Sequence, residues 1–154
     1  MAADAPALDG ARIAAAFEHA PALTGPLLRG GPYADPDAVL QEAERIVATL
    51  GEPEQAALLA AHPRIGADPA TLSAASAREQ GGETDPAALR ELTRLNGEYE
   101  RRFGFRFVVF VAGRPKAALL PVLRERLARE RASELRTGLA ELLAIARDRL
   151  TRPS

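Results

Sequence analysis

Proline and glycine divide this chain into segments whose apolar residues recur three and four positions apart, as on one face of a helix. Ala, Leu, Glu and Arg dominate these segments, and all four residue types favour helix. Asp35-Pro36 and Asp85-Pro86 are typical helix starts, in which a capping carboxylate precedes a proline in the first turn. The pattern therefore predicts an all-α fold.

We expect a single domain over residues 1–154, with residues 1–8 as a loose arm before the first helix. The expected architecture is a bundle of about seven or eight helices. Residues 105–111, Phe-Arg-Phe-Val-Val-Phe-Val, form the one strand-like stretch. Because no second stretch could pair with it, we predict a short buried extended segment among helices. The expected helices span residues 9–18, 21–28, 36–50, 52–61, 73–80, 86–103, 117–129 and 133–150.

Composition and charge exclude several classes of protein. Twenty basic and 21 acidic residues give a net charge of -1, which leaves no basic excess for binding nucleic acid. The absence of cysteine excludes disulfides, thiol nucleophiles and cysteine-ligated metals, and two histidines argue against a histidine-rich metal site. No apolar run approaches the ~20 residues that cross a bilayer, and no signal peptide is visible. We expect a cytoplasmic protein without cofactor or metal.

Two short segments carry candidate chemistry. His62 and Pro63 open a loop punctuated by proline, and histidine changes its charge near neutral pH; the alternative is a histidine that caps the preceding helix. Ser76, Glu79 and Gln80 stand at positions i, i+3 and i+4 and so share one helix face. Their polar groups could grip a ligand, or Ser76 and Glu79 could form a capping box.

Four further features remain open at this stage. Asn96 lies within a strongly helical segment, where it could mark a functional site or bond a neighbouring loop. The extended segment leaves backbone groups available to a ligand. An inward-facing arginine on the last helix, Arg136, Arg147 or Arg149, could pair with a carboxylate. His19 lies at a helix end beside Pro21, and we expect a structural role for it.

Several segments follow one another in a distinctive order and spacing. They are Phe17-Glu18-His19-Ala20-Pro21, His62-Pro63-Arg64-Ile65-Gly66, residues 72–80, Leu95-Asn96 with Tyr99, residues 102–107, Glu134-Leu135 and residues 145–150. Together they resemble the 2-oxo-4-hydroxy-4-carboxy-5-ureidoimidazoline (OHCU) decarboxylase family of urate degradation, and the resemblance covers residues 9–150.

The resemblance implies an all-helical, cofactor-free and usually dimeric enzyme that forms (S)-allantoin. It implies that His62 and Glu79 are catalytic and handle protons. The implied substrate-binding residues are Pro63, Ser76, Gln80, the backbone near Phe107 and Val108, and Arg149, with Arg147 as the weaker choice. We therefore expect a small-molecule substrate, a homodimer, and no nucleic acid or membrane partner.

Two alternatives remain beside this interpretation. Ala22 and Ala112 stand where the family often has tryptophan and arginine, which keeps open a related helical lyase acting on another ureido or imidazoline compound. A non-catalytic helical interaction module is the second alternative. It predicts that His62 and Glu79 lie too far apart to share a ligand.

Overall fold

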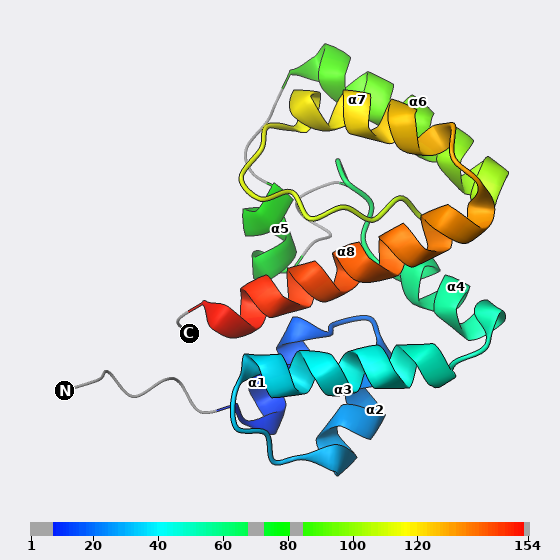
Figure 1. The fold of residues 1–154 in the computed structure, drawn as a ribbon. Helices are drawn as coiled ribbons and strands as arrows, with labels where there is room; N and C mark the ends of the chain where they lie inside the picture. Colours follow the sequence, from blue (N-terminus) through cyan, green and yellow to red (C-terminus); the bar gives the residue numbers. More distant parts are fainter. Residues whose placement is uncertain (1–7, 68–72, 81–84, 153–154) are drawn as a thin grey trace.

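The computed structural model describes residues 8–67, 73–80 and 85–152 of the chain (Figure 1). Within these residues there are helices and loops but no β-strand, which confirms the prediction of an all-α fold. The helices are α1 (Gly10–Ala16), α2 (Pro21–Gly30), α3 (Pro36–Thr49), α4 (Glu52–Ala60), α5 (Ala74–Gln80), α6 (Pro86–Phe103), α7 (Lys116–Leu127) and α8 (Arg131–Thr151).

Aspartate side chains begin three of the helices, as the sequence predicts. The Asp9 carboxylate accepts a hydrogen bond of 2.8 Å from the backbone N–H of Arg12. Asp35 and Asp85 accept equivalent bonds at the starts of α3 and α6. Each bond satisfies a backbone donor that the first helical turn leaves without a partner.

Several helix boundaries differ from the prediction by one or two residues; α2, for example, continues to Gly30 and α7 ends at Leu127. Helix α1 ends at Ala16 instead of residue 18, because the chain turns there and His19 adopts a left-handed conformation with φ of 64°. Helix α8 begins at Arg131, before the expected cap Ser133. The Arg131 side chain donates to the backbone oxygen of Phe103 at 3.0 Å, which holds the earlier start of α8 in place.

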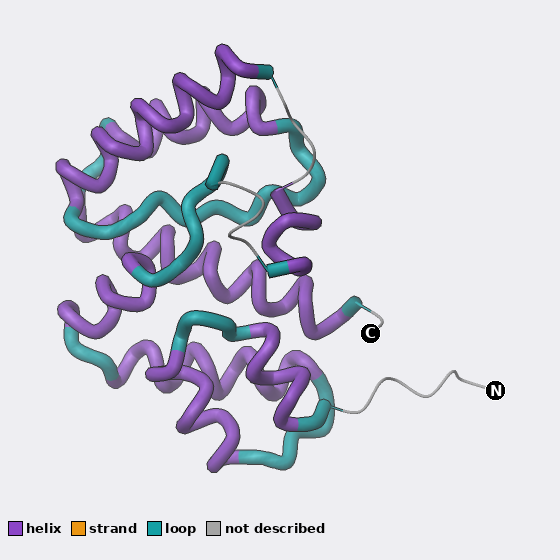
Figure 2. The backbone as a smooth tube through the Cα atoms, turned by 180° about the vertical axis from the view of Figure 1, so that it is seen from behind, coloured by secondary structure: helices purple, strands orange, loops and turns teal. Residues whose placement is uncertain are grey.

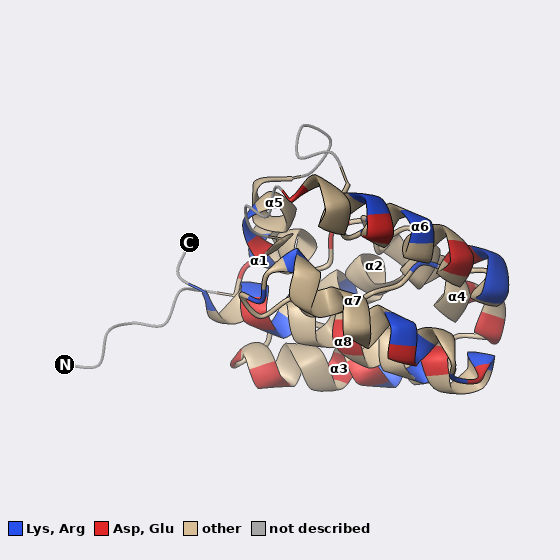
Figure 3. Cartoon of the chain, turned by 90° about the horizontal axis from the view of Figure 1, so that it is seen from above, with Lys and Arg blue, Asp and Glu red and all other residues tan. Residues whose placement is uncertain are grey.

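Helix α8 runs through the middle of the molecule and contacts α1, α3 and α4 (Figure 1). Helices α6 and α7 pack against each other on the opposite side of α8 from α1, α2 and α3 (Figures 1 and 2). Acidic and basic residues are interspersed along α6 (Figure 3), where Arg94 pairs with Glu91 and Glu98. None of the described helices has both the length and the apolar character that crossing a bilayer requires.

The predicted extended segment, residues 105–111, runs as a loop between the α6–α7 pair and α8 (Figure 1). Phe105 and Phe107 are each 1% exposed, and both rings lie within 6.1 Å of the Tyr99 ring, centroid to centroid. Edge-on aromatic contacts of this kind stabilise a core beyond the area that they bury. The segment is therefore part of the hydrophobic core, as expected.

A buried ion pair anchors the same segment. Arg126 on α7 donates to Glu134 on α8 at 2.7 Å and to the backbone oxygen of Val108 at 2.7 Å. The Tyr99 hydroxyl donates to the same Glu134 oxygen at 2.6 Å. Arg126 also lies over the face of Phe107, 4.7 Å from the ring centroid. These contacts connect α6, α7 and α8 to the extended segment.

Candidate active site

The loop that carries His62 is fixed by side chains from two helices. Gln80 on α5 accepts a bond from the Gly66 N–H at 2.9 Å and donates to the Arg64 oxygen at 3.0 Å. Asn96 on α6 donates to the Ile65 oxygen at 3.0 Å. Gly66 has φ of 84°, a left-handed conformation that favours glycine. Three consecutive residues of the loop are thereby held.

These hydrogen bonds distinguish the two interpretations of Asn96, and they show which groups the Gln80 amide contacts. Asn96 is 5% exposed and bonds a neighbouring loop, so its structural interpretation is confirmed. Gln80, expected from the resemblance to bind substrate, uses both ends of its amide on the loop backbone. In this arrangement Gln80 positions the segment that follows His62.

His62 lies directly after α4, with its backbone N–H bonded to the Leu59 oxygen at 3.3 Å. Its Nδ1 lies 3.1 Å from the backbone oxygen of Pro63, instead of bonding the last carbonyls of α4. Because a carbonyl oxygen only accepts, this contact requires the hydrogen on Nδ1 and leaves the Nε2 lone pair free. Burial lowers the pKa of His62 to about 4, and the Arg149 charge contributes in the same direction, although the Pro63 oxygen and Glu18 oppose it. The imidazole is therefore neutral near pH 7.

Helix α5 begins with Ser73 as its cap. The Ser73 hydroxyl oxygen accepts a bond from the Ser76 N–H at 3.1 Å. Ser76 is 3% exposed and lies inside the helix, so the capping-box alternative for Ser76 is wrong. Ser76 and Glu79 instead direct their side chains toward Arg149 on α8.

Arg149 is the centre of a polar cluster. Its Nε lies 2.5 Å from Oε1 of Glu79, and its Nη2 lies 3.2 Å from the Ser76 hydroxyl and 3.1 Å from Oε1 of Glu18. The Arg149 side chain is 7% exposed. Arg147, the weaker sequence choice, is 52% exposed and pairs with Asp37 on the surface. The geometry thus puts Arg149, and not Arg147, beside the candidate residues.

Glu18 belongs to this cluster although sequence reasoning gave it no role. Its Oε1 accepts from the hydroxyls of Ser76 at 2.8 Å and Ser73 at 2.9 Å. Burial raises the pKa of Glu18, but these two hydrogen bonds and the charges of Arg149 and His19 outweigh burial and lower it. Glu18 lies within Phe17–Pro21, a segment that resembles the family, and this resemblance was the one feature of the sequence that could have indicated a role for it.

His62, Glu18 and Arg149 line one small cavity between α1, α4 and α8, with apolar walls from Ala16, Phe17, Ala20, Leu58, Leu142 and Ile145. About 10 Å³ is free inside it, about the space of a single water molecule. Glu79 also lines a hollow of about 200 Å³ open to solvent, with Arg78, Arg114 and Arg152 at its rim. The polar cluster therefore lies between a closed cavity and an open hollow.

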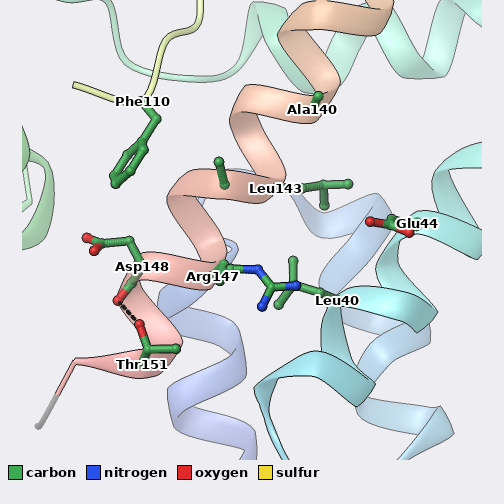
Figure 4. Close-up of a pocket in the computed structure, with 9 residues that line it drawn as sticks. Leu40, Glu44, Phe110, Ala140, Leu143, Arg147, Asp148 and Thr151 are labelled. Atoms are coloured by element: carbon green, nitrogen blue, oxygen red, sulfur yellow. Dashed lines mark hydrogen bonds between the residues drawn. The ribbon is translucent and has the colours of Figure 1, made fainter. Parts of the chain in front are cut away.

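A larger hollow of about 400 Å³ lies elsewhere, between α3 and α8 (Figure 4). Leu40, Phe110 and Leu143 give it apolar walls, and Arg147 reaches across it toward α3. Apart from Arg147, the weaker sequence choice, it contains none of the residues expected to be catalytic or substrate-binding.

The expected residues of the extended segment lie apart from the small cavity. Phe107 and Val108 are each 1% exposed and are not among the residues that line it. The Phe107 ring packs on Tyr99, and the Val108 oxygen accepts from Arg126. Pro63 is half-buried beside His62. No group of three or more acidic or histidine side chains among the described residues could hold a metal ion.

Comparison with known proteins relates this cluster to a family. Residues 8–151 match the model of the OHCU decarboxylase family. The chain belongs to that family. The prediction from sequence of a decarboxylase, a carboxy-lyase of uric acid degradation, is thereby confirmed. An interaction module is excluded on the same ground. Glu79 pairs with Arg149, and His62 lines the small cavity together with Arg149.

Relatives extend over most of the chain. The 2-oxo-4-hydroxy-4-carboxy-5-ureidoimidazoline decarboxylase of Haloferax volcanii is 29% identical over 137 residues, which are 87% of this chain and 82% of the relative. The bifunctional uric acid degradation protein PucL of Bacillus subtilis is 32% identical over 138 residues, 87% of this chain but 28% of that longer protein. A crystal structure of OHCU decarboxylase in the presence of (S)-allantoin superposes with a TM-score of 0.73 at 26% identity, covering 90% of this chain and 94% of that one.

Proposed function

We propose that this protein converts 2-oxo-4-hydroxy-4-carboxy-5-ureidoimidazoline to (S)-allantoin, with His62 and Glu79 handling protons and Arg149 holding the substrate. The observation that carries the proposal is the convergence of four segments on Arg149. The turn after α1, the loop after α4, helix α5 and the end of α8 all meet there. A neutral imidazole, a carboxylate and a guanidinium are then available around one small ligand.

The reaction needs little beyond positioning and proton transfer. The bond between the ring carbon and its carboxylate breaks, and carbon dioxide leaves. The electron pair moves into the ring toward the neighbouring imine nitrogen, which takes up a proton. The hydroxyl on the first carbon loses its proton to become a carbonyl, and the adjacent ring carbon gains a proton. One proton is consumed overall. Because the substrate holds its own electron acceptor, the chemistry calls for no external electron sink.

His62 suits the role of the base that takes up the hydroxyl proton in this sequence. Its Nδ1 is directed to the Pro63 oxygen, so Nε2 is the atom that accepts the hydroxyl proton. A neutral imidazole can accept a proton at once and return it later in the same turnover. The imidazolium formed in this way is then able to protonate the ring carbon from one face, which fixes the product's handedness.

Arg149 and Glu79 account for substrate capture. The free space beside Arg149 is about 10 Å³, so a ring-sized ligand must displace the Glu79–Arg149 pair. Release of that pair connects the small cavity with the hollow of about 200 Å³ whose rim carries three arginines. The guanidinium can then bind the substrate carboxylate or ureido group through two parallel bonds, and the freed Glu79 faces the ligand.

The test follows product handedness. Freshly generated urate-oxidation intermediate is added to the protein, and circular dichroism records the appearance of (S)-allantoin. We expect rapid formation of an optically active product, in contrast to the slow, racemic decay of the intermediate alone. Consumption of the intermediate without an (S)-allantoin signal would instead favour the related lyase.

We also propose that the protein is a cytoplasmic homodimer that binds neither nucleic acid nor membranes. Family resemblance supports the dimer, and the charge of -1 argues against nucleic acid. Light scattering during size-exclusion chromatography should give twice the chain mass of 16.4 kDa. A monomer at micromolar concentration would contradict the dimer without affecting the proposed chemistry.

A further inference from the structure

We propose that Glu18 is a positioning residue that keeps Arg149 in place when Glu79 releases it to the substrate. This inference rests on the proposed function. It begins with the contacts of a single atom: Oε1 of Glu18 accepts hydrogen bonds from Ser73 at 2.9 Å and Ser76 at 2.8 Å, and it forms an ion pair with Nη2 of Arg149 at 3.1 Å. Two hydroxyl donors from the start of α5 and one cation from α8 thus converge on one carboxylate oxygen.

The backbone on both sides of Glu18 is held by hydrogen bonds, which fix the position of this residue. The Phe17 N–H bonds back to the Ile13 oxygen at 3.1 Å, and the Ala20 N–H bonds to the Phe17 oxygen at 3.1 Å. Between them His19 has φ of 64°, which is uncommon for a residue with a side chain and costs about 1 kcal/mol. The strained turn places Glu18 with its side chain 22% exposed.

Glu18 also fixes the direction of the Ser76 hydroxyl. A hydroxyl has one hydrogen to donate, and Ser76 donates it to Glu18. The serine oxygen then has its lone pairs free to accept from Nη2 of Arg149, 3.2 Å away. Glu18 therefore holds Arg149 directly through its charge and indirectly through Ser76.

The two glutamates consequently have different tasks. Glu79 binds Arg149 through Nε and Nη2, the edge that a planar ligand would need, and it also faces the open hollow. Glu18 binds Arg149 from the closed cavity. When a ligand replaces Glu79, the contacts to Glu18, to Ser76 and to the Ala15 oxygen at 3.4 Å remain. The guanidinium stays oriented without the catalytic carboxylate.

Kinetics of Glu18→Gln test the proposal. Glutamine retains the size of the side chain and an acceptor oxygen but removes the charge that holds Arg149. We expect KM to rise about tenfold with kcat within about threefold of wild type, as for lost uniform binding of the substrate. A merely structural role would lower the thermal midpoint and the active fraction with no change in KM. Glu54→Gln, an exposed glutamate on α4, is the matched control.

Carboxyl ¹³C resonances test the same proposal in the unmodified protein. Saturating (S)-allantoin should shift the Glu79 signal strongly and leave the Glu18 signal nearly unchanged. A wild-type KM in folded Glu18→Gln, or a Glu18 signal that moves as much as that of Glu79, would overturn the proposal.

Hydrogen exchange at Nη2 of Arg149, the nitrogen that lies 3.1 Å from Glu18, separates this inference from the proposed function. It should be several-fold faster in ligand-free Glu18→Gln than in wild type, because the guanidinium is less constrained. If the wild-type protein forms no (S)-allantoin, the proposed function fails, and this exchange rate alone decides whether Glu18 holds Arg149. Unchanged exchange would refute that role.

Discussion

Replacing His62 with glutamine should alter the dependence of stability on pH in a specific direction. Folding lowers the pKa of His62 from 6.5 to about 4, with burial as the largest cause. Between these two values the unfolded chain therefore binds more protons than the folded one. Stability is then complete above the unfolded pKa and is lost as the pH falls toward the folded pKa. Glutamine cannot titrate, so His62→Gln lacks this acid-dependent loss.

The pKa difference sets the size of the effect. Relative to neutral pH, protonation of His62 in the unfolded state costs the wild-type protein about 1.4 kcal/mol near pH ~5.5 and about 2.5 kcal/mol near pH ~4.5. His62 is partly exposed, so these are upper values. The carboxylates of the protein also titrate in this range, but they do so in both proteins and largely cancel in the difference.

Urea denaturation followed by circular dichroism provides the measurement, at about pH 7.5, 5.5 and 4.5. The stability of wild type minus that of His62→Gln should fall steadily as the pH falls. His19→Gln, which removes the exposed second histidine, is the control for loss of an imidazole. A difference that does not vary with pH would show that His62 is not held neutral. A difference that grows toward acid would mean that the imidazole is charged in the folded protein, and the assignment of His62 as a base would fail.

Four further predictions concern the core, the loop and the chemistry. Arg126→Met should cost about 3–5 kcal/mol in urea denaturation, because it removes the cation that lies 2.7 Å from the buried Glu134 carboxylate. Addition of Glu134→Leu should recover much of that loss, and a cost for Arg126→Met below about 1 kcal/mol would argue against a charged pair. Gln80→Ala should destabilise by about 1–3 kcal/mol in the same assay, since two backbone groups of the loop lose their partner; no change would mean that water replaces the amide without penalty. Glu79→Gln should lower turnover about 100-fold or more with little change in thermal midpoint, whereas a small loss of stability at full rate would leave Glu79 structural. Exhaustive chelation should leave (S)-allantoin formation unchanged, and a loss that added metal restores would contradict the cofactor-free chemistry.

Local signals in the sequence were sufficient for most of the fold. The carboxylates of Asp9, Asp35 and Asp85 act on backbone groups three residues away or closer, so a helix start of this kind can be recognised without tertiary information. The start of α8 could not be recognised in this way. It depends on Arg131, whose guanidinium bonds the oxygen of Phe103 in another part of the chain, and this contact outweighs the local preference of Ser133.

The candidate site shows the same division between local and long-range information. Helical spacing placed Ser76 and Glu79 on one face of α5, and they do lie together. Spacing contained no information on what that face meets, because Glu18 and Arg149 come from opposite ends of the chain. The family resemblance supplied Arg149. Glu18 was missed because an acidic residue at the end of a short helix is ordinarily a solvated one.

Because Glu79 contacts Arg149, its carboxylate is an intramolecular competitor of any acidic ligand for the Arg149 guanidinium. Glu79 is part of the same chain, so its effective concentration at Arg149 stays high at any concentration of free ligand. A measured dissociation constant for an acidic ligand therefore reports the exchange of the Glu79 carboxylate for that of the ligand. It understates the intrinsic affinity of the Arg149 guanidinium for the ligand. A neutral compound that leaves the Glu79–Arg149 pair intact does not have to displace Glu79. Its binding free energy should therefore lack the cost of breaking that pair, which an anion of the same shape has to meet.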